Sequence, residues 1–187
     1  AVGLPMAFQY SITAIGTTMV QMALNTLGST YVAAFTAASK CEQMAGQAYI
    51  ALGSAIATFA AQNVGAGRYD RVRKGFARTT EFGFIFSIVM GFIMYIFGYV
   101  VTGLFVSGDA SALEGMVDVY MKFTALFLFP LTIVNVYRNG IQGMGYGLLP
   151  MMAGVAELVG RGSVALIAIH YHSYNGVCLA SPMAWIL

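Results

Sequence analysis

The sequence has 187 residues, of which 59% are hydrophobic and only 9% charged, and its net charge is +2. A soluble domain carries about 25% charged residues, so this chain has too few charges to face water on all sides. Lipid must be its outer solvent, and the near-neutral charge argues against nucleic acid as a partner. We therefore expect an all-α integral membrane protein whose surroundings are a lipid bilayer.

The apolar residues gather into six segments, each a candidate for a helix that crosses the membrane. They cover about 4–27, 31–64, 76–106, 116–143, 148–169 and 176–187. The chain does not begin with methionine, and it ends inside the last apolar run. We expect a single transmembrane lobe that is a fragment of something longer, with its last helix truncated.

Polar side chains recur along the first segment at every fourth position. Gln9, Thr13, Thr17 and Gln21 form this row, and Asn25 continues it. Four-residue spacing keeps them on one slowly drifting face of a helix, which we expect to look into the bundle. Hydrogen bonding between helices and the lining of a substrate cavity both fit such a row.

The second segment repeats the polar row more loosely through Gln43 and Gln47. Its other faces carry small residues that predict close packing against a neighbouring helix; these are Ala37, Ala45, Ala48, Ala51, Ala55 and Ala57. Glu42, near Lys40, is a carboxylate that would be costly in lipid. It fits a binding site for an ion or a cationic substrate, and it also fits an interfacial charge.

Charge is unevenly divided between the links that join the segments. Basic residues concentrate between the second and third segments: Arg68, Arg71, Arg73, Lys74 and Arg78. The next link carries Asp109, Glu114 and Asp118 and has no Lys or Arg before Lys122. The positive-inside rule predicts that residues 65–78 form a cytoplasmic loop. A site for lipid headgroups is the alternative interpretation of the basic cluster.

The fourth segment should be kinked by Pro130, which lacks a backbone donor. Beyond it, Asn135, Arg138 and Asn139 share one helix face. An arginine at membrane depth costs about 2.5–3.5 kcal/mol unless it is paired or reaches water. Glu157 is the natural partner, and we predict a polar network of Arg138, Glu157 and Arg161. It would hold the fold together, with direct substrate binding as the alternative.

Other reactive residues give weak signals. Cys41 and Cys178 lie in apolar surroundings without the spacing of a metal or disulfide motif. His170 and His172 have no acidic or thiol companion nearby, so we expect no metal site and no cofactor. Motifs of hydrolases, zinc proteases and nucleotide-binding loops are absent, which argues against an enzyme.

Several short runs, in order and in spacing, resemble the C-terminal lobe of a bacterial multidrug and toxic compound extrusion (MATE) transporter. They are 25–29 (NTLGS), 61–68 (AQNVGAGR), 71–75 (RVRKG), 137–145 (YRNGIQGMG), 157–159 (ELV) and 176–182 (GVCLASP). The resemblance implies helices seven to twelve of a twelve-helix fold, with the N-terminal lobe missing. It also implies a multi-pass protein of the bacterial cytoplasmic membrane.

The implied activity is export of amphipathic, often cationic, organic compounds by antiport with Na⁺ or H⁺ through alternating access. The partners would be the N-terminal lobe and a small organic substrate. A lipid-linked oligosaccharide flippase of the same superfamily is the alternative. A membrane-embedded enzyme is a third hypothesis, for which only the group around Glu157 comes near to convergent catalytic side chains.

The sequence departs from part of this family at the coupling site. Some members carry acidic residues in helices seven and ten, where this chain has Gln9 and Gln21, then Asn135 and Asn139. An ion site of that kind is therefore not expected here. Coupling would rest on an acidic residue of the missing lobe, and these amides would line the cavity as neutral donors and acceptors.

Overall fold

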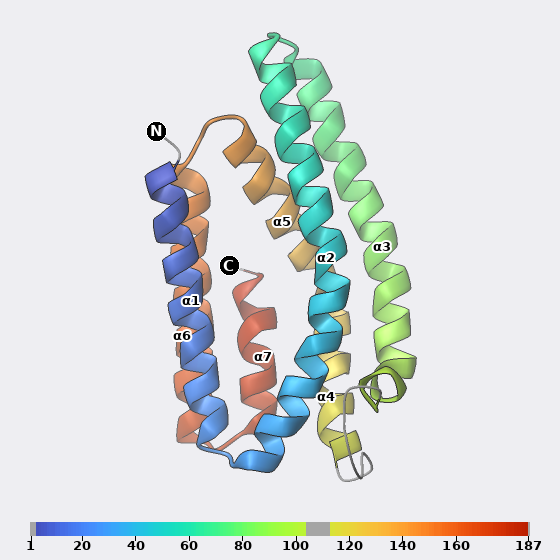
Figure 1. Ribbon diagram of the computed structural model, residues 1–187, viewed down its shortest axis with the longest axis vertical. Coiled ribbons are helices and arrows are strands. Elements are labelled where there is room, and N and C mark those ends of the chain that lie inside the picture. Colours follow the sequence, from blue (N-terminus) through green and yellow to red (C-terminus); the bar gives the residue numbers. More distant parts are fainter. Residues whose placement is uncertain (1–2, 104–112, 187) are drawn as a thin grey trace.

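The computed structural model describes residues 3–103 and 113–186, and within these ranges its regular structure is helical (Figure 1). The elements are α1 (Gly3–Asn25), α2 (Ser29–Gly65), α3 (Tyr69–Gly103), α4 (Glu114–Leu126), α5 (Leu128–Gly143), α6 (Leu148–His170) and α7 (Tyr174–Ala184). By length and composition, α2, α3 and α6 can each cross a membrane, and so can α4 and α5 if they form one span. The all-α membrane fold expected from composition is confirmed.

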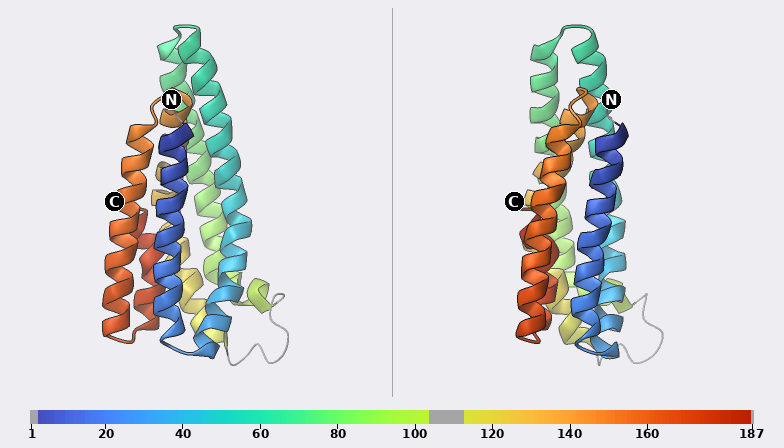
Figure 2. Two further views of the ribbon diagram at one scale, coloured as in Figure 1. Left: turned by 60° about the vertical axis from the view of Figure 1, so that its left-hand side comes forward. Right: turned by 90° about the vertical axis from the view of Figure 1, so that its left-hand side faces the viewer.

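The helices form one bundle in which α1 lies along α6, and α2 and α3 form a long hairpin beside α5 (Figures 1 and 2). The N-terminal end of α1, the α2–α3 turn and the α5–α6 turn lie toward one end of the bundle. The α1–α2 and α6–α7 turns lie toward the other end. This arrangement is what a chain crossing a membrane back and forth requires.

The predicted kink in the fourth segment is confirmed, and it divides that segment into two helices. α4 and α5 meet at an angle of 52°. The break is at Phe127, three residues before Pro130. Proline has no N–H to donate to the carbonyl of Leu126, and its ring clashes with that carbonyl in a straight helix. The bend therefore begins one turn before the proline.

The prediction that residues 65–78 form a loop was wrong. α2 ends at Gly65 and α3 already begins at Tyr69, so most of the basic residues lie on helix. Gly67, with φ of +67°, ends α2, and the Arg68 amide donates to the Asn63 carbonyl across it. Apolar content marked only the apolar part of α3, whereas Arg and Lys are themselves good helix formers and extend the helix toward its N-terminus.

The small residues of α2 do not all lie in the core of the lobe. Ala37 and Ala45 are buried in the core, as close packing requires, whereas Ala51 and Ala55 are exposed on the surface of the lobe. The tightest approach is between α2 and α5, where a Cβ on Gly143 would overlap the backbone carbonyl of Ala57. A glycine at this position lets the two backbones meet.

Replacing Gly143 with alanine should therefore destabilise the lobe by about 1–3 kcal/mol, because the added methyl group meets backbone that cannot rotate away. Thermal unfolding of the purified protein would measure this. Gly115→Ala is the matched control, since a Cβ there has no atom within 4 Å. Equal melting temperatures for the two variants would contradict the close approach.

Candidate functional site

A cavity of about 310 Å³ opens among α1, α2, α5, α6 and α7. Six of the polar residues singled out from the sequence line it: Thr17, Glu42, Gln43, Gln47, Asn135 and Arg161. They come from four separate helices, so the cavity exists only because the bundle brings those helices together. Its wall combines one carboxylate and one guanidinium with neutral hydroxyl and amide groups.

Glu42 is the acidic residue of this cavity. It lies 13 residues after Ser29, the first residue of α2, or roughly 20 Å along the helix. Its carboxylate accepts a hydrogen bond from the hydroxyl of Tyr120, a buried residue of α4. Phe35 packs edge-on against the Tyr120 ring, with 4.8 Å between ring centroids. These contacts hold the carboxylate within the bundle, which does not favour the interfacial placement left open by the sequence.

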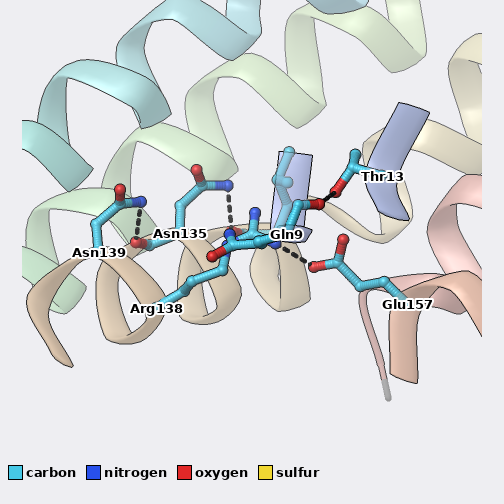
Figure 3. Close-up of polar contacts among 7 residues, drawn as sticks. Gln9, Thr13, Asn135, Arg138, Asn139 and Glu157 are labelled. Carbon is cyan, nitrogen blue, oxygen red and sulfur yellow. Dashed lines mark hydrogen bonds and ion pairs between the residues drawn. The ribbon is translucent and has the colours of Figure 1, made fainter. Parts of the chain in front are cut away.

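Arg138 and Glu157 form an ion pair between α5 and α6, with 2.7 Å between Nη1 and Oε1 (Figure 3). Their side chains are only 19% and 6% exposed, so the pair is largely withdrawn from solvent. This buried charge pair joins α5 and α6 in addition to the short turn that connects them. Breaking it would leave one buried charge uncompensated.

Arg161, one turn after Glu157 on α6, is only 6% exposed. Its Nε has no hydrogen-bond partner among the described residues, and its side chain packs against Gly16 of α1. Glu157 lies one turn earlier on the same helix, and Glu42 lines the same cavity. Arg161 and Glu42 therefore contribute a guanidinium and a carboxyl group to the same cavity wall.

The row of polar residues on α1 does not share one environment. Gln9 is buried against Gly154 of α6, and its Oε1 has no partner in the described part of the chain. The Thr13 hydroxyl donates to the Gln9 backbone carbonyl. Gln21 is exposed and donates to the Asn25 side chain. Of this row, Thr17 lines the cavity.

The two asparagines of α5 use their amide groups within their own helix. Asn135 Nδ2 donates to the Leu131 carbonyl at 3.1 Å, and Asn139 Nδ2 donates to the Asn135 carbonyl at 2.8 Å (Figure 3). Asn139 also lies against Gly53 of α2, where no side chain intervenes. Asn135 lines the cavity, whereas Asn139 packs at the α2–α5 contact.

Comparison with known proteins gives the chain its family. The MatE family model matches residues 5–165, which is most of the sequence. The chain belongs to the MATE family. Its members are membrane transporters rather than enzymes. No curated protein matches the sequence.

Solved structures show the same fold at low identity. A MATE protein in complex with MaL6 superposes with a TM-score of 0.90 at 19% identity, over 99% of this chain and 42% of that one. An outward-facing multidrug resistance MATE transporter of the MOP superfamily gives 0.87 at 20% identity, over 99% and 42%. A MOP superfamily transporter from Pyrococcus furiosus, described as having a binding pocket of reversed polarity, gives 0.88 at 16% identity, over 99% and 41%. The chain thus spans about 42% of the length of such structures.

The structure also places a polar cluster in this MATE lobe that sequence reasoning missed. The Tyr49 hydroxyl lies 2.9 Å from Ser87 Oγ, which lies 2.8 Å from Thr132 Oγ1. The hydroxyl oxygens of Ser87 and Thr132 also lie 3.2 Å and 3.1 Å from the carbonyl oxygen of Leu128, just after the α4–α5 break. The cluster joins α2, α3 and α5, and Tyr49 and Leu128 also line the cavity. A serine isolated within the apolar run of α3 was the signal available in the sequence.

Proposed function

We propose that this chain is one half of a secondary active transporter that exports amphipathic, cationic organic compounds in exchange for Na⁺ or H⁺. The observation that carries the proposal is the cavity whose wall holds the carboxylate of Glu42 together with Arg161 and neutral polar groups from several helices. A carboxylate is costly inside a membrane protein, and its presence there is best explained by binding a cation. In alternating access, an ion and a cationic substrate would occupy such a group in turn.

The other half of the cavity would come from a second lobe. At 310 Å³ the cavity is near the lower limit for a drug-sized ligand, which an opposing lobe would enlarge and close. Thr17, Gln43, Gln47 and Asn135 would then supply neutral donors and acceptors, and Gln9 would lie deeper in the wall. The end that carries Arg68 and Arg71 would face the cytoplasm of a bacterial cell.

Cysteine labelling tests whether the cavity is open to water. In the complete transporter, with Cys41 and Cys178 replaced by serine, a cysteine at Gln43 or Asn135 should react with a polar thiol reagent, and substrate should slow the reaction. A cysteine at Ala38, a fully buried position of α2, is the matched control and should stay unlabelled. Absence of labelling at both cavity positions from either side of the membrane would refute the proposal.

A lipid-linked oligosaccharide flippase remains the second candidate function, and Arg161 is the observation in its favour. A guanidinium at the cavity wall, whose Nε has no hydrogen-bond partner among the described residues, suits the diphosphate of a lipid-linked sugar. Transport of a fluorescent organic cation should be compared with flipping of a lipid-linked sugar in the same vesicles. Movement of the lipid alone would replace the first proposal with the second.

A further inference from the structure

A second hollow lies on the outside of the lobe, between α2 and α3 near the turn that joins them. It is a groove of about 460 Å³ and shares no lining residue with the cavity described above. Ala55, Ile56 and Phe59 form its α2 wall. The α3 wall changes in character along its length, from basic residues near the turn to Phe82 at the other end.

The basic part of the groove consists of Arg71, Lys74 and Arg78, which lie at i, i+3 and i+7 and so share one face of α3. Arg71 stands over the Phe59 ring, 6.0 Å from its centroid. Arg78 pairs with the exposed Glu81, but within the described chain neither Arg71 nor Lys74 has a carboxylate at ion-pair distance. The groove therefore keeps an uncompensated positive charge.

The basic row continues a stripe that has the character of a lipid-facing surface. Beyond Arg78 the same spacing leads through Phe82, Ile85, Val89 and Phe92, which are 52–64% exposed. Large apolar side chains exposed along a membrane-spanning helix are suited to contact acyl chains. The groove thus runs from hydrocarbon depth toward the headgroups. Arg71 and Phe82 lie eleven residues apart on the helix, or roughly 16 Å, which is enough to reach from the headgroups to the acyl chains.

The groove also lies away from the side of α2 that would meet a second lobe. At about 100° per residue, Ala55 and Phe59 lie about 80–160° around the helix from Gln43 and Gln47, which line the cavity. A lobe that closes over the cavity would leave the groove facing lipid. Gly75, without a side chain, deepens the groove, since a Cβ there would meet the Phe59 ring.

We propose that this groove is a binding site for one anionic phospholipid. Arg71 and Lys74 hold the headgroup phosphate, with Arg78 at the edge, and an acyl chain lies against Ala55 and Phe82. A zwitterionic lipid should bind less tightly, because its own amine offsets the phosphate charge beside these cations. A free phosphate would contact only the basic half of the groove and should bind more weakly than the lipid.

Native mass spectrometry of the complete transporter, titrated with phosphatidylglycerol, tests this site. Arg71→Gln/Lys74→Gln should weaken phosphatidylglycerol binding by about tenfold or more. The matched control, Arg68→Gln/Arg73→Gln, removes two charges from the same hairpin outside the groove and should change binding little. Ala55→Trp fills the apolar half at an exposed position and should also weaken binding, with every charge kept.

Several results would overturn the proposal. Equal binding of phosphatidylcholine and phosphatidylglycerol would make the site one for any phospholipid. Displacement of the lipid by inorganic phosphate at equal concentration would make it one for any phosphate. Equal losses in the two double variants would mean diffuse attraction to the hairpin. If the groove double variant does not fold, Ala55→Trp decides alone, and unchanged phosphatidylglycerol binding in that variant rejects the site.

Discussion

Replacing Glu42 with glutamine should lower ion-driven export by about tenfold or more, while the protein still folds. Glutamine keeps the size of the side chain and can still accept a hydrogen bond from Tyr120, but it carries no charge to bind an ion or a cationic substrate. The measurement is uptake of a fluorescent organic cation into vesicles that contain the complete transporter, driven by an imposed Na⁺ or H⁺ gradient. Tyr120→Phe keeps the charge and removes only the donor, so its effect should be smaller.

Glu114→Gln is the matched control for this experiment. It makes the same chemical change at an exposed carboxylate in the first turn of α4, outside the cavity, and should leave export unchanged. Export by Glu42→Gln at the rate of the unmodified protein would show that ion coupling lies elsewhere. The acidic residue would then be sought in the second lobe, as the neutral Gln9 and Asn135 already suggested.

The largest loss of stability is expected from Glu157→Ala. This change leaves Arg138 without its partner in a site where both side chains are mostly buried, and it removes the carboxylate nearest in sequence to the buried Arg161. Breaking a buried pair from one side costs about 3–5 kcal/mol, mainly because the remaining charge is stranded. Thermal unfolding in detergent, together with the yield of folded protein, would record the effect.

Two further variants show whether a stranded charge is the cause. Asp118→Asn breaks the pair of Asp118 with Lys122, whose side chains are 35% and 42% exposed, and should cost less than about 1 kcal/mol. Arg138→Met combined with Glu157→Leu removes both charges and should restore much of the stability lost in Glu157→Ala. If the double variant were as unstable as the single one, lost packing rather than charge would explain the result.

Properties that depend on the cost of a group in lipid could be predicted from the sequence. The scarcity of charge required a membrane protein, and the apolar runs placed most of the helices. Pro130 predicted a bend because its missing N–H interrupts the hydrogen bonds of its own helix, whichever helices pack around it. Arg138 required a partner, since a lone guanidinium at membrane depth is costly wherever the helix points. The same reliance on apolar content misplaced the start of α3, whose first turns are rich in Arg and Lys.

Only the tertiary structure decided which polar groups meet. Glu42 and Tyr120 are 78 positions apart, and their contact depends on the rotation of α2 and α4 about their axes. Tyr49, Ser87 and Thr132 join three helices in the same way, and Thr17 reaches the cavity while Gln21, four residues later, does not. Periodicity gathers side chains on one face of a helix, but the neighbour that this face meets depends on how the whole bundle packs. The sequence by itself therefore determined the solvent, the helices and the charges that need partners, whereas packing decided the cavity, its carboxylate and the basic groove.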